Sequence, residues 1–257
     1  MRRTTPLLAL PILFASALAF AADGHSRSAA EVQSSRYGRL DGKHFTAEVE
    51  MQIERDGRRE DRRLLVWRDD EGGSHERILA RFVAPADLKD FGLLFLENEN
   101  RPNDYFVHQP ELARVRRVSE SVASQDIYGV DLDFLGFGVA QSVRCEATGV
   151  EHSDFEGRPA YRLTERALDS NQRFDERVTW IDATSFVPVR TEHRRGGKPM
   201  LIAQVRRLET IQGVATPMES VFERPAAAER VTMIVRRIDY ETPIARDFFS
   251  TLALIKR

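Results

Sequence analysis

Residues 45–54 alternate strictly between apolar and polar side chains, and this alternation constrains the fold more than any other feature of the chain. The apolar members are Phe45, Ala47, Val49, Met51 and Ile53, and each is followed by a polar residue. Successive side chains of a β-strand point to opposite faces, so a period of two gathers the apolar residues on one face. A helix of the same sequence would spread them around its circumference. The segment therefore predicts a strand with one face in an apolar core.

Similar segments recur along the chain, separated by turn residues. Asp56-Gly57, Gly196-Gly197 and Gln212-Gly213 are typical of tight hairpin turns. We expect about ten to twelve strands, and Pro188 and Pro217 favour strand beginnings or sheet edges. The candidate segments for these strands are residues 45–54, 61–67, 76–83, 91–96, 105–107, an arginine-containing run after residue 112, 143–150, 160–164, 177–181, 186–193, 200–208, 216–223 and 229–240.

So many antiparallel strands must close on themselves or have their edges covered. No break in composition divides the chain, so we expect one domain over residues 22–257. The predicted fold is mainly β: a single twisted antiparallel sheet rolled into a half-open barrel and covered by short helices. The covering segments are residues 84–90 and 126–138, while residues 28–37 predict a short helix or a loose tail and residues 244–254 a docked helix or strand.

The first 21 residues have the features of a cleaved signal peptide. Arg2 and Arg3 precede an apolar run over residues 7–20, and Ala19-Phe20-Ala21 supplies the small residues of a cleavage site. A membrane-spanning helix needs about 20 apolar residues, and this run is shorter. We therefore expect an exported protein. Its single cysteine, Cys145, allows no intramolecular disulfide, so the fold must rest on its own core.

The sequence offers little that points to catalysis. Lys+Arg 38 against Asp+Glu 40 gives a net charge of -2, so the basic excess of a nucleic-acid-binding protein is absent. The six histidines are scattered without metal-ligand spacing, and no nucleophile-elbow or nucleotide-binding motif occurs. Acidic pairs such as Asp69-Asp70 fit turns and caps better than acid–base chemistry. We expect no catalytic residue, no metal and no cofactor, and an exported hydrolase is the least favoured alternative.

A series of motifs in fixed order resembles a known family. Residues 81–89 read R-F-x-x-P-A-D-x-K, residues 109–118 read x-P-x-L-x-R-V-R-R-V, and an aspartate-rich segment follows. Further matching segments are residues 178–190, 213–218 and 243–249. Together they resemble the outer membrane lipoprotein-sorting proteins, relatives of the periplasmic lipoprotein carrier LolA and its receptor LolB. The chain departs from the family at residues 133–137, where a tyrosine-glutamate-aspartate-leucine segment is usual.

This resemblance implies a half-open barrel with a lid, located in the periplasm. It also implies a carrier, not an enzyme, which binds acyl chains of a lipoprotein or lipid in a hydrophobic cavity and transfers them toward the outer membrane. The alternative is an accessory interaction protein of an inner-membrane lipid exporter. In neither case would the mature protein span the membrane.

Candidate site residues follow from the expected inward faces. Packed core remains the alternative for each apolar residue, and ordinary surface ion pairs for the arginines. The expected cavity residues are Phe45, Val49, Met51, Leu65, Trp67, Phe82, Leu94, Phe106 and Trp180. The expected lid residues are Leu132, Phe134, Leu135 and Phe137, and the expected docking residues for an acidic partner or anionic headgroups are Arg114, Arg116 and Arg117. Of these three arginines, Arg114 and Arg116 share one strand face, and Arg117 lies on the other.

Overall fold

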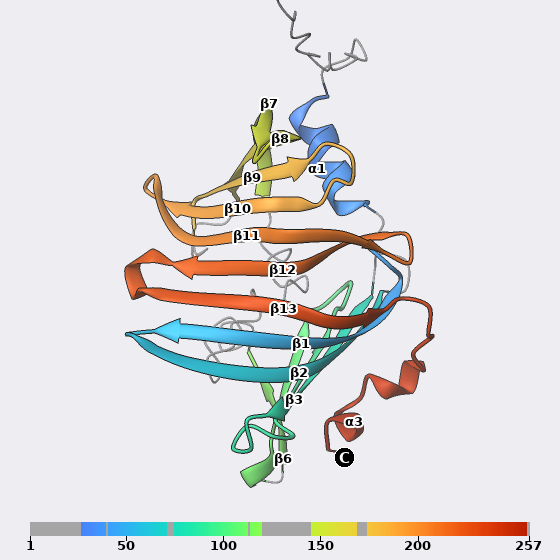
Figure 1. The fold of residues 1–257 in the computed structure, drawn as a ribbon. Coiled ribbons are helices and arrows are strands. Elements are labelled where there is room, and N and C mark those ends of the chain that lie inside the picture. Colours follow the sequence, from blue (N-terminus) through green and yellow to red (C-terminus); the bar gives the residue numbers. More distant parts are fainter. Residues whose placement is uncertain are drawn as a thin grey trace, which may run out of the picture.

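A computed structural model describes residues 27–39, 41–70, 75–112, 114–119, 145–168 and 174–255. These residues form one antiparallel sheet of 13 strands, in the order β6-β5-β4-β3-β2-β1-β13-β12-β11-β10-β9-β8-β7 (Figure 1). The strands are β1 (His44–Arg55), β2 (Arg58–Asp70), β3 (Glu76–Ala84), β4 (Gly92–Leu96), β5 (Asp104–Gln109), β6 (Arg114–Val118), β7 (Cys145–Phe155), β8 (Arg158–Ala167), β9 (Glu176–Asp182), β10 (Pro188–Arg195), β11 (Lys198–Ile211), β12 (Val214–Arg224) and β13 (Glu229–Asp239). Strands β6 and β7 are the two edges, so the sheet is not closed.

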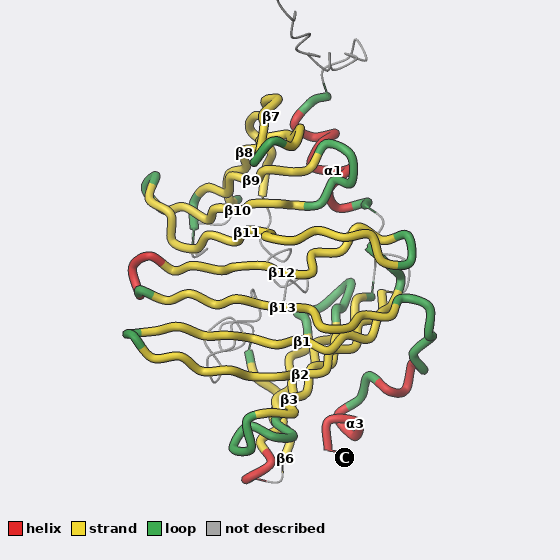
Figure 2. Tube along the Cα trace, viewed as in Figure 1, coloured by secondary structure: helices red, strands yellow, loops and turns green. Residues whose placement is uncertain are grey.

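The predicted mainly β fold with a single antiparallel sheet is confirmed. The sheet curls so that β3 to β6 turn behind the strands that face the viewer (Figure 1). Figure 2 shows strand over most of the described chain, with short helical pieces at the periphery. These are α1 (Ala29–Tyr37), α3 (Thr251–Ile255) and the 3-10 turns η1 (Pro110–Leu112), η4 (Pro225–Ala227) and η5 (Arg246–Phe248).

Local sequence explains the first hairpin. In β1 every second residue from Phe45 to Ile53 is buried, as the alternation predicts. Asp56 and Gly57 have φ of 51° and 72°. This pair of positive values is the signature of a two-residue type I′ turn, whose twist matches that of the flanking strands. The turn therefore sets the register of β1 against β2 from Arg55–Arg58 to His44–Asp69.

Both faces of the β2–β5 part of the sheet are covered. The inner face carries the large core, which includes Met51, Leu64, Phe82 and Met233. On the outer face a second cluster joins Leu79 and Leu94 to residues 244–254 of the C-terminal segment, with η5 and α3. The expected docking of that segment is confirmed, and it packs on the outer side of the sheet.

One expected cover is a turn instead of a helix. Residues 85–90 join β3 to β4 through the bonds Leu88 N to Pro85 O, at 3.2 Å, and Phe91 N to Leu88 O, at 3.0 Å. Asp90 then takes φ of 68°, which ends any helical path and returns the chain into β4. The other expected cover, residues 126–138, lies outside the described residues.

Candidate functional site

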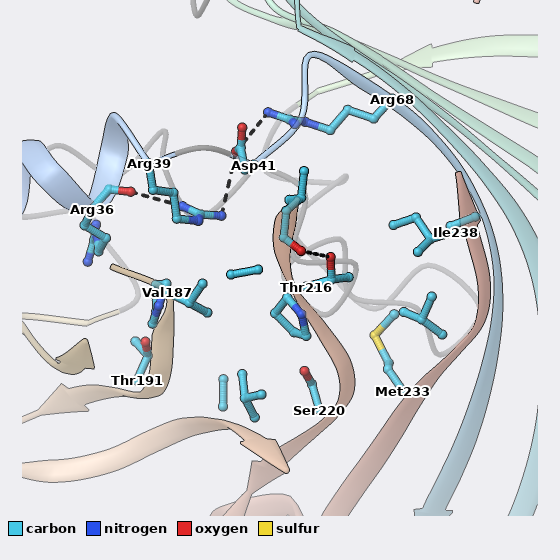
Figure 3. Close-up of a pocket in the computed structure, with 18 of the residues that line it drawn as sticks. Arg36, Arg39, Asp41, Arg68, Val187, Thr191, Thr216, Ser220, Met233 and Ile238 are labelled. Atoms are coloured by element: carbon cyan, nitrogen blue, oxygen red, sulfur yellow. Dashed lines mark hydrogen bonds and ion pairs between the residues drawn. The ribbon is translucent and has the colours of Figure 1, made fainter. Parts of the chain in front are cut away.

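A cavity of about 340 Å³ lies on the inner face of the sheet (Figure 3). It is bounded by α1 and the residues after it, by β1, by Arg68 of β2 and Glu76 of β3, and by β9 to β13. Apolar side chains form most of its wall. These apolar side chains include Val49, Leu201, Ala203, Phe222, Met233 and Val235.

The cavity lies where β12 and β13 separate. Their pairing runs from Arg224–Glu229 to Glu219–Ile234 and stops there. Beyond that point β12 continues on β11 as far as Val214, while β13 continues on β1 as far as Asp239. Figure 1 shows the two strands diverging. Pro217 is inside β12, an interior strand of the sheet, so the expected position at a strand beginning or sheet edge is wrong. The proline has no N–H to donate, and it lies in the part of β12 that has separated from β13.

A hydroxyl pair bridges the gap between the separated strands. The Tyr240 and Thr216 hydroxyl oxygens are 2.9 Å apart. Thr216 donates its single hydroxyl proton to Val214 O at 3.0 Å, so Tyr240 is the donor of the pair. The Tyr240 ring meets Phe45 edge-on at 5.8 Å. The ring also lies against Gly42, where an added Cβ would be 2.4 Å from the Cδ1 of Tyr240. Burial raises the pKa of Tyr240, so the phenol stays protonated.

Charged side chains gather on one side of the cavity. Arg68 is the centre of this group: its guanidinium lies 2.6 Å from Glu76, 3.2 Å from Asp70 and 3.4 Å from Asp41. Arg39 lies 3.7 Å from Asp41 and donates to the Arg36 carbonyl at 3.1 Å. Figure 3 places Arg39 and Asp41 opposite Ser220 and Met233. The cavity is therefore charged on one side and mostly apolar elsewhere.

A buried ion-pair network holds α1 against the sheet. Glu165, which is fully buried, accepts hydrogen bonds from Arg177 at 2.7 Å, Arg36 at 3.1 Å and Gln33 at 2.7 Å. Burial alone would raise the pKa of Glu165, but the hydrogen bonds and charges of Arg177 and Arg36 outweigh it and lower the pKa. Val32 of α1 packs beside them on Leu163 and Ile181.

Two of the nine expected cavity residues, Phe45 and Val49, line the cavity. Met51 and Phe82 lie on the same face but inside the packed core. The inner-face assignment of these four residues therefore agrees with the structure, while only the first two reach the open space.

The expected inward placement of the other five residues is wrong. Trp67, Leu94 and Phe106 belong to the outer-face cluster, where Trp67 meets Phe248 at 5.1 Å. Leu65 pairs with Glu48, whose side chain is on the outer face of β1. The alternation separated the two faces of the sheet correctly. The outer face is also apolar where the C-terminal segment packs on it, so apolar side chains alone did not show which face is the inner one.

Trp180 is likewise on the outer face. Its ring lies between the guanidinium groups of Arg162 and Arg190, at 5.5 and 5.7 Å from the ring centroid. Its neighbours Thr179 and Ile181 point inward. The tryptophan is therefore stabilised by cation–π contacts with two outer-face arginines and not by a cavity wall.

The expected docking arginines lie on the edge strand β6. Arg114, Arg116 and Arg117 are all exposed, and Arg117 pairs with Asp104 at 2.5 Å. Arg116 is opposite Val107 of the inner face, and Arg117 is opposite Phe106 of the outer face, as the alternation predicts. Their docking role stays a prediction. The expected lid residues Leu132, Phe134, Leu135 and Phe137 lie outside the described residues.

The polar side of the cavity was not predicted from the sequence. Arg36 belongs to residues 28–37, for which the sequence predicts a helix or a tail, Arg39 follows that segment, and Tyr240 comes directly after the last strand. One available signal was the capping box: Ser28 accepts from Glu31 N, and Glu31 reaches back to Ser28 N at 2.6 Å. The Ser-x-x-Glu spacing would have favoured an ordered helix here.

Within the described ranges, no group of His, Cys, Asp or Glu side chains is arranged to hold a metal ion. In the same residues no helix has both the length and the apolar character needed to cross a membrane.

Known structures share this open antiparallel sheet, and the fold is LolA-like. A "putative outer membrane lipoprotein-sorting protein domain" from Vibrio parahaemolyticus has a TM-score of 0.77 and 18% identity, covering 88% of this chain and 97% of that one. A DUF1329 family protein from Desulfovibrio piger has a TM-score of 0.75 and 19% identity, covering 88% of this chain and 95% of that one. A LolA superfamily protein from Nitrosomonas europaea has a TM-score of 0.63 and 16% identity, covering 88% of this chain and 98% of that one.

At these identities the likeness concerns the fold alone. A family model described as "Uncharacterized protein" matches residues 74–256, which is more than half of the sequence, so the chain belongs to that family. No curated protein matches the sequence.

Proposed function

We propose that this protein is a non-enzymatic periplasmic carrier that binds an acyl chain of a lipoprotein or lipid and transfers it toward the outer membrane. The observation that carries the proposal is the cavity on the inner face, with its apolar wall of strand side chains. The LolA-like fold is in keeping with a binding role. The periplasmic location rests on the signal sequence expected in residues 1–21, which lie outside the described residues.

The size of the cavity suits a small apolar ligand. Its volume, about 340 Å³, is within the range of roughly 300–1,000 Å³ usual for ligand sites. Each buried methylene contributes about 0.8 kcal/mol, so burying about six would contribute about 5 kcal/mol before the entropic cost of association. Part of one acyl chain is therefore enough for useful binding.

The alternative proposal, an accessory protein of an inner-membrane lipid exporter, is favoured by one feature. Arg114 and Arg116 are exposed on the edge strand β6. An edge strand with exposed cations offers both backbone pairing and charge to an acidic partner. In that case variants of these arginines would weaken a complex with the exporter and leave lipid binding intact.

Filling the cavity tests the carrier proposal. Ala203 lies on the cavity wall between Thr191 of β10 and Phe222 of β12. Ala203→Trp places an indole in the open space, and we expect it to weaken binding of a neutral apolar fluorescent probe by at least about tenfold, the loss of roughly two buried methylenes' worth of contact.

The matched control is Ala86→Trp, in the exposed turn between β3 and β4. It should bind the probe like the wild type. Circular dichroism and urea unfolding check that both variants fold. A folded Ala203→Trp protein that binds the probe normally, together with the absence of co-purified lipid by mass spectrometry, would refute the carrier proposal.

A further inference from the structure

Arg39 is the cavity arginine whose charge is least compensated. Within the described part of the chain its guanidinium makes one hydrogen bond, to the Arg36 carbonyl at 3.1 Å, and lies 3.7 Å from Asp41. The second distance is longer than a hydrogen bond, so among the described residues most of the five N–H donors of this side chain have no protein acceptor.

The nearest carboxylate is shared with another cation. Asp41 also lies 3.4 Å from Arg68, which itself has Asp70 and Glu76 as closer partners. Three carboxylates therefore surround Arg68, while Arg39 has only Asp41 nearby, at a longer distance and shared with Arg68. Burial lowers the pKa of Arg39, with Arg68 and Arg36 acting in the same direction against Asp41. The surroundings thus disfavour the charge of Arg39.

The position of Arg39 joins this charge to the apolar space. It lines the cavity together with Val49, Phe222 and Met233. Figure 3 shows Arg39 and Asp41 on one side of the cavity, with Thr216 between them and the apolar side. A ligand with an anionic head and an apolar tail would find a matching partner for each part within one site.

We propose that the cargo is an amphiphile with an anionic head, a carboxylate or a phosphate, which Arg39 binds while the tail lies along the wall formed by Val49, Phe222 and Met233. A guanidinium binds such oxygens through paired N–H donors, and the bond is strong because both partners are charged. The inference deepens the proposed carrier function and rests on it. Asp41 competes with the head for Arg39 but keeps Arg68 as its partner when the ligand is bound.

Binding of matched twelve-carbon probes tests this inference. Dodecanoate, dodecyl phosphate and neutral dodecanol are each tested for displacement of a neutral fluorescent probe from the mature wild-type protein. The anions are kept below their micelle concentrations and the alcohol below its solubility limit. We expect one or both anions to bind at least about tenfold more tightly than dodecanol, as charged hydrogen bonds predict. Comparing the two anions distinguishes a fatty acid from a phospholipid as the source of the head.

Variants locate the preference. In Arg39→Gln the affinities for the anionic probes and for dodecanol should differ by no more than about twofold. Arg39→Lys should retain part of the preference for the anions, because lysine keeps the charge but not the paired donors. The control is Arg207→Gln, an exposed arginine paired with Glu209 on β11, which should keep the wild-type ratio.

The outcomes separate the two levels of the proposal. Equal wild-type affinities for all three probes would overturn the anionic head and leave the carrier function standing. An anion preference that persists in folded Arg39→Gln would overturn the role of Arg39. Wild-type protein that binds none of the probes would overturn the carrier function itself. The wild-type comparison needs no variant, so it stays decisive if Arg39→Gln fails to fold.

Discussion

At the scale of single residues, Glu165 is the carboxylate on which the attachment of α1 depends. It is fully buried and lies between the guanidinium groups of Arg36 and Arg177. Removing one member of a buried charge network leaves the others uncompensated, which usually costs about 3–5 kcal/mol. Glu165→Gln should therefore lower the free energy of unfolding by about that amount, measured by urea denaturation.

Glu151→Gln is the matched control, because Glu151 pairs with Arg162 at the surface and its side chain is 59% exposed. Exposed pairs contribute about 0–1 kcal/mol. Equal losses of stability in the two variants would show that the buried network is no more important than a surface pair.

Acid should remove the contribution of Glu165. Its pKa in the folded protein is lower than the ordinary value of 4.5, so the folded state favours the charged form. The stabilisation is thus complete above about pH 4.5 and is lost as the pH falls through the folded-state pKa. The stability difference between wild type and Glu165→Gln should narrow on going from pH 7 to pH 3. A constant difference over that range would contradict this assignment.

At the scale of elements, the C-terminal segment acts as part of the fold. Leu254 of α3 is 1% exposed and packs with Leu79 and Leu94 on the outer face. Its Cδ2 also fills the space above Gly92, where an added Cβ would lie 2.8 Å away. The helix is short, so its stability comes from this packing and not from its own hydrogen bonds.

Leu254→Ala should lower the free energy of unfolding by about 2–5 kcal/mol, the usual cost of truncating a buried leucine. The control on the same helix is Leu252→Ala, whose side chain is 57% exposed and should change stability by no more than about 0.5 kcal/mol. Urea denaturation of both variants measures the difference. If the two agree, the segment is not part of the cooperative unit.

At the scale of the whole molecule, the separation of β12 from β13 makes the half-barrel hollow. Neighbouring N–H groups of an antiparallel strand point to opposite sides. About half of those in residues 214–218 and 235–239 therefore point toward the gap, where the β12–β13 ladder has ended. The hydroxyl pair of Tyr240 and Thr216 bridges this gap through side chains only.

Amide hydrogen exchange should report this separation. We expect the gap-facing amides of residues 214–218 and 235–239 to exchange at least about tenfold faster than those of residues 219–224 and 229–234, where the two strands pair. The fully paired β1–β2 hairpin supplies the internal reference. Uniform protection along both strands would mean that the gap is closed in solution.

Much of the architecture was predictable, because strand alternation and hairpin turns are local. The pattern over residues 45–54 became β1 with little change of bounds, and Pro188 begins β10 as predicted. The candidate site was less predictable. Phe45 and Val49 reach the cavity, but Trp67 and Trp180 do not, since a large apolar residue suits either face.

The sequence by itself determined that this chain forms one antiparallel sheet with two distinct faces, because a period of two and a tight turn need only neighbouring residues. Only the tertiary structure decided which face is hollow and where its charge lies. The C-terminal segment covers the outer face, and α1 reaches Glu165 across 132 positions of sequence from Gln33. Such contacts depend on how the sheet curls, and no local pattern encodes that curvature.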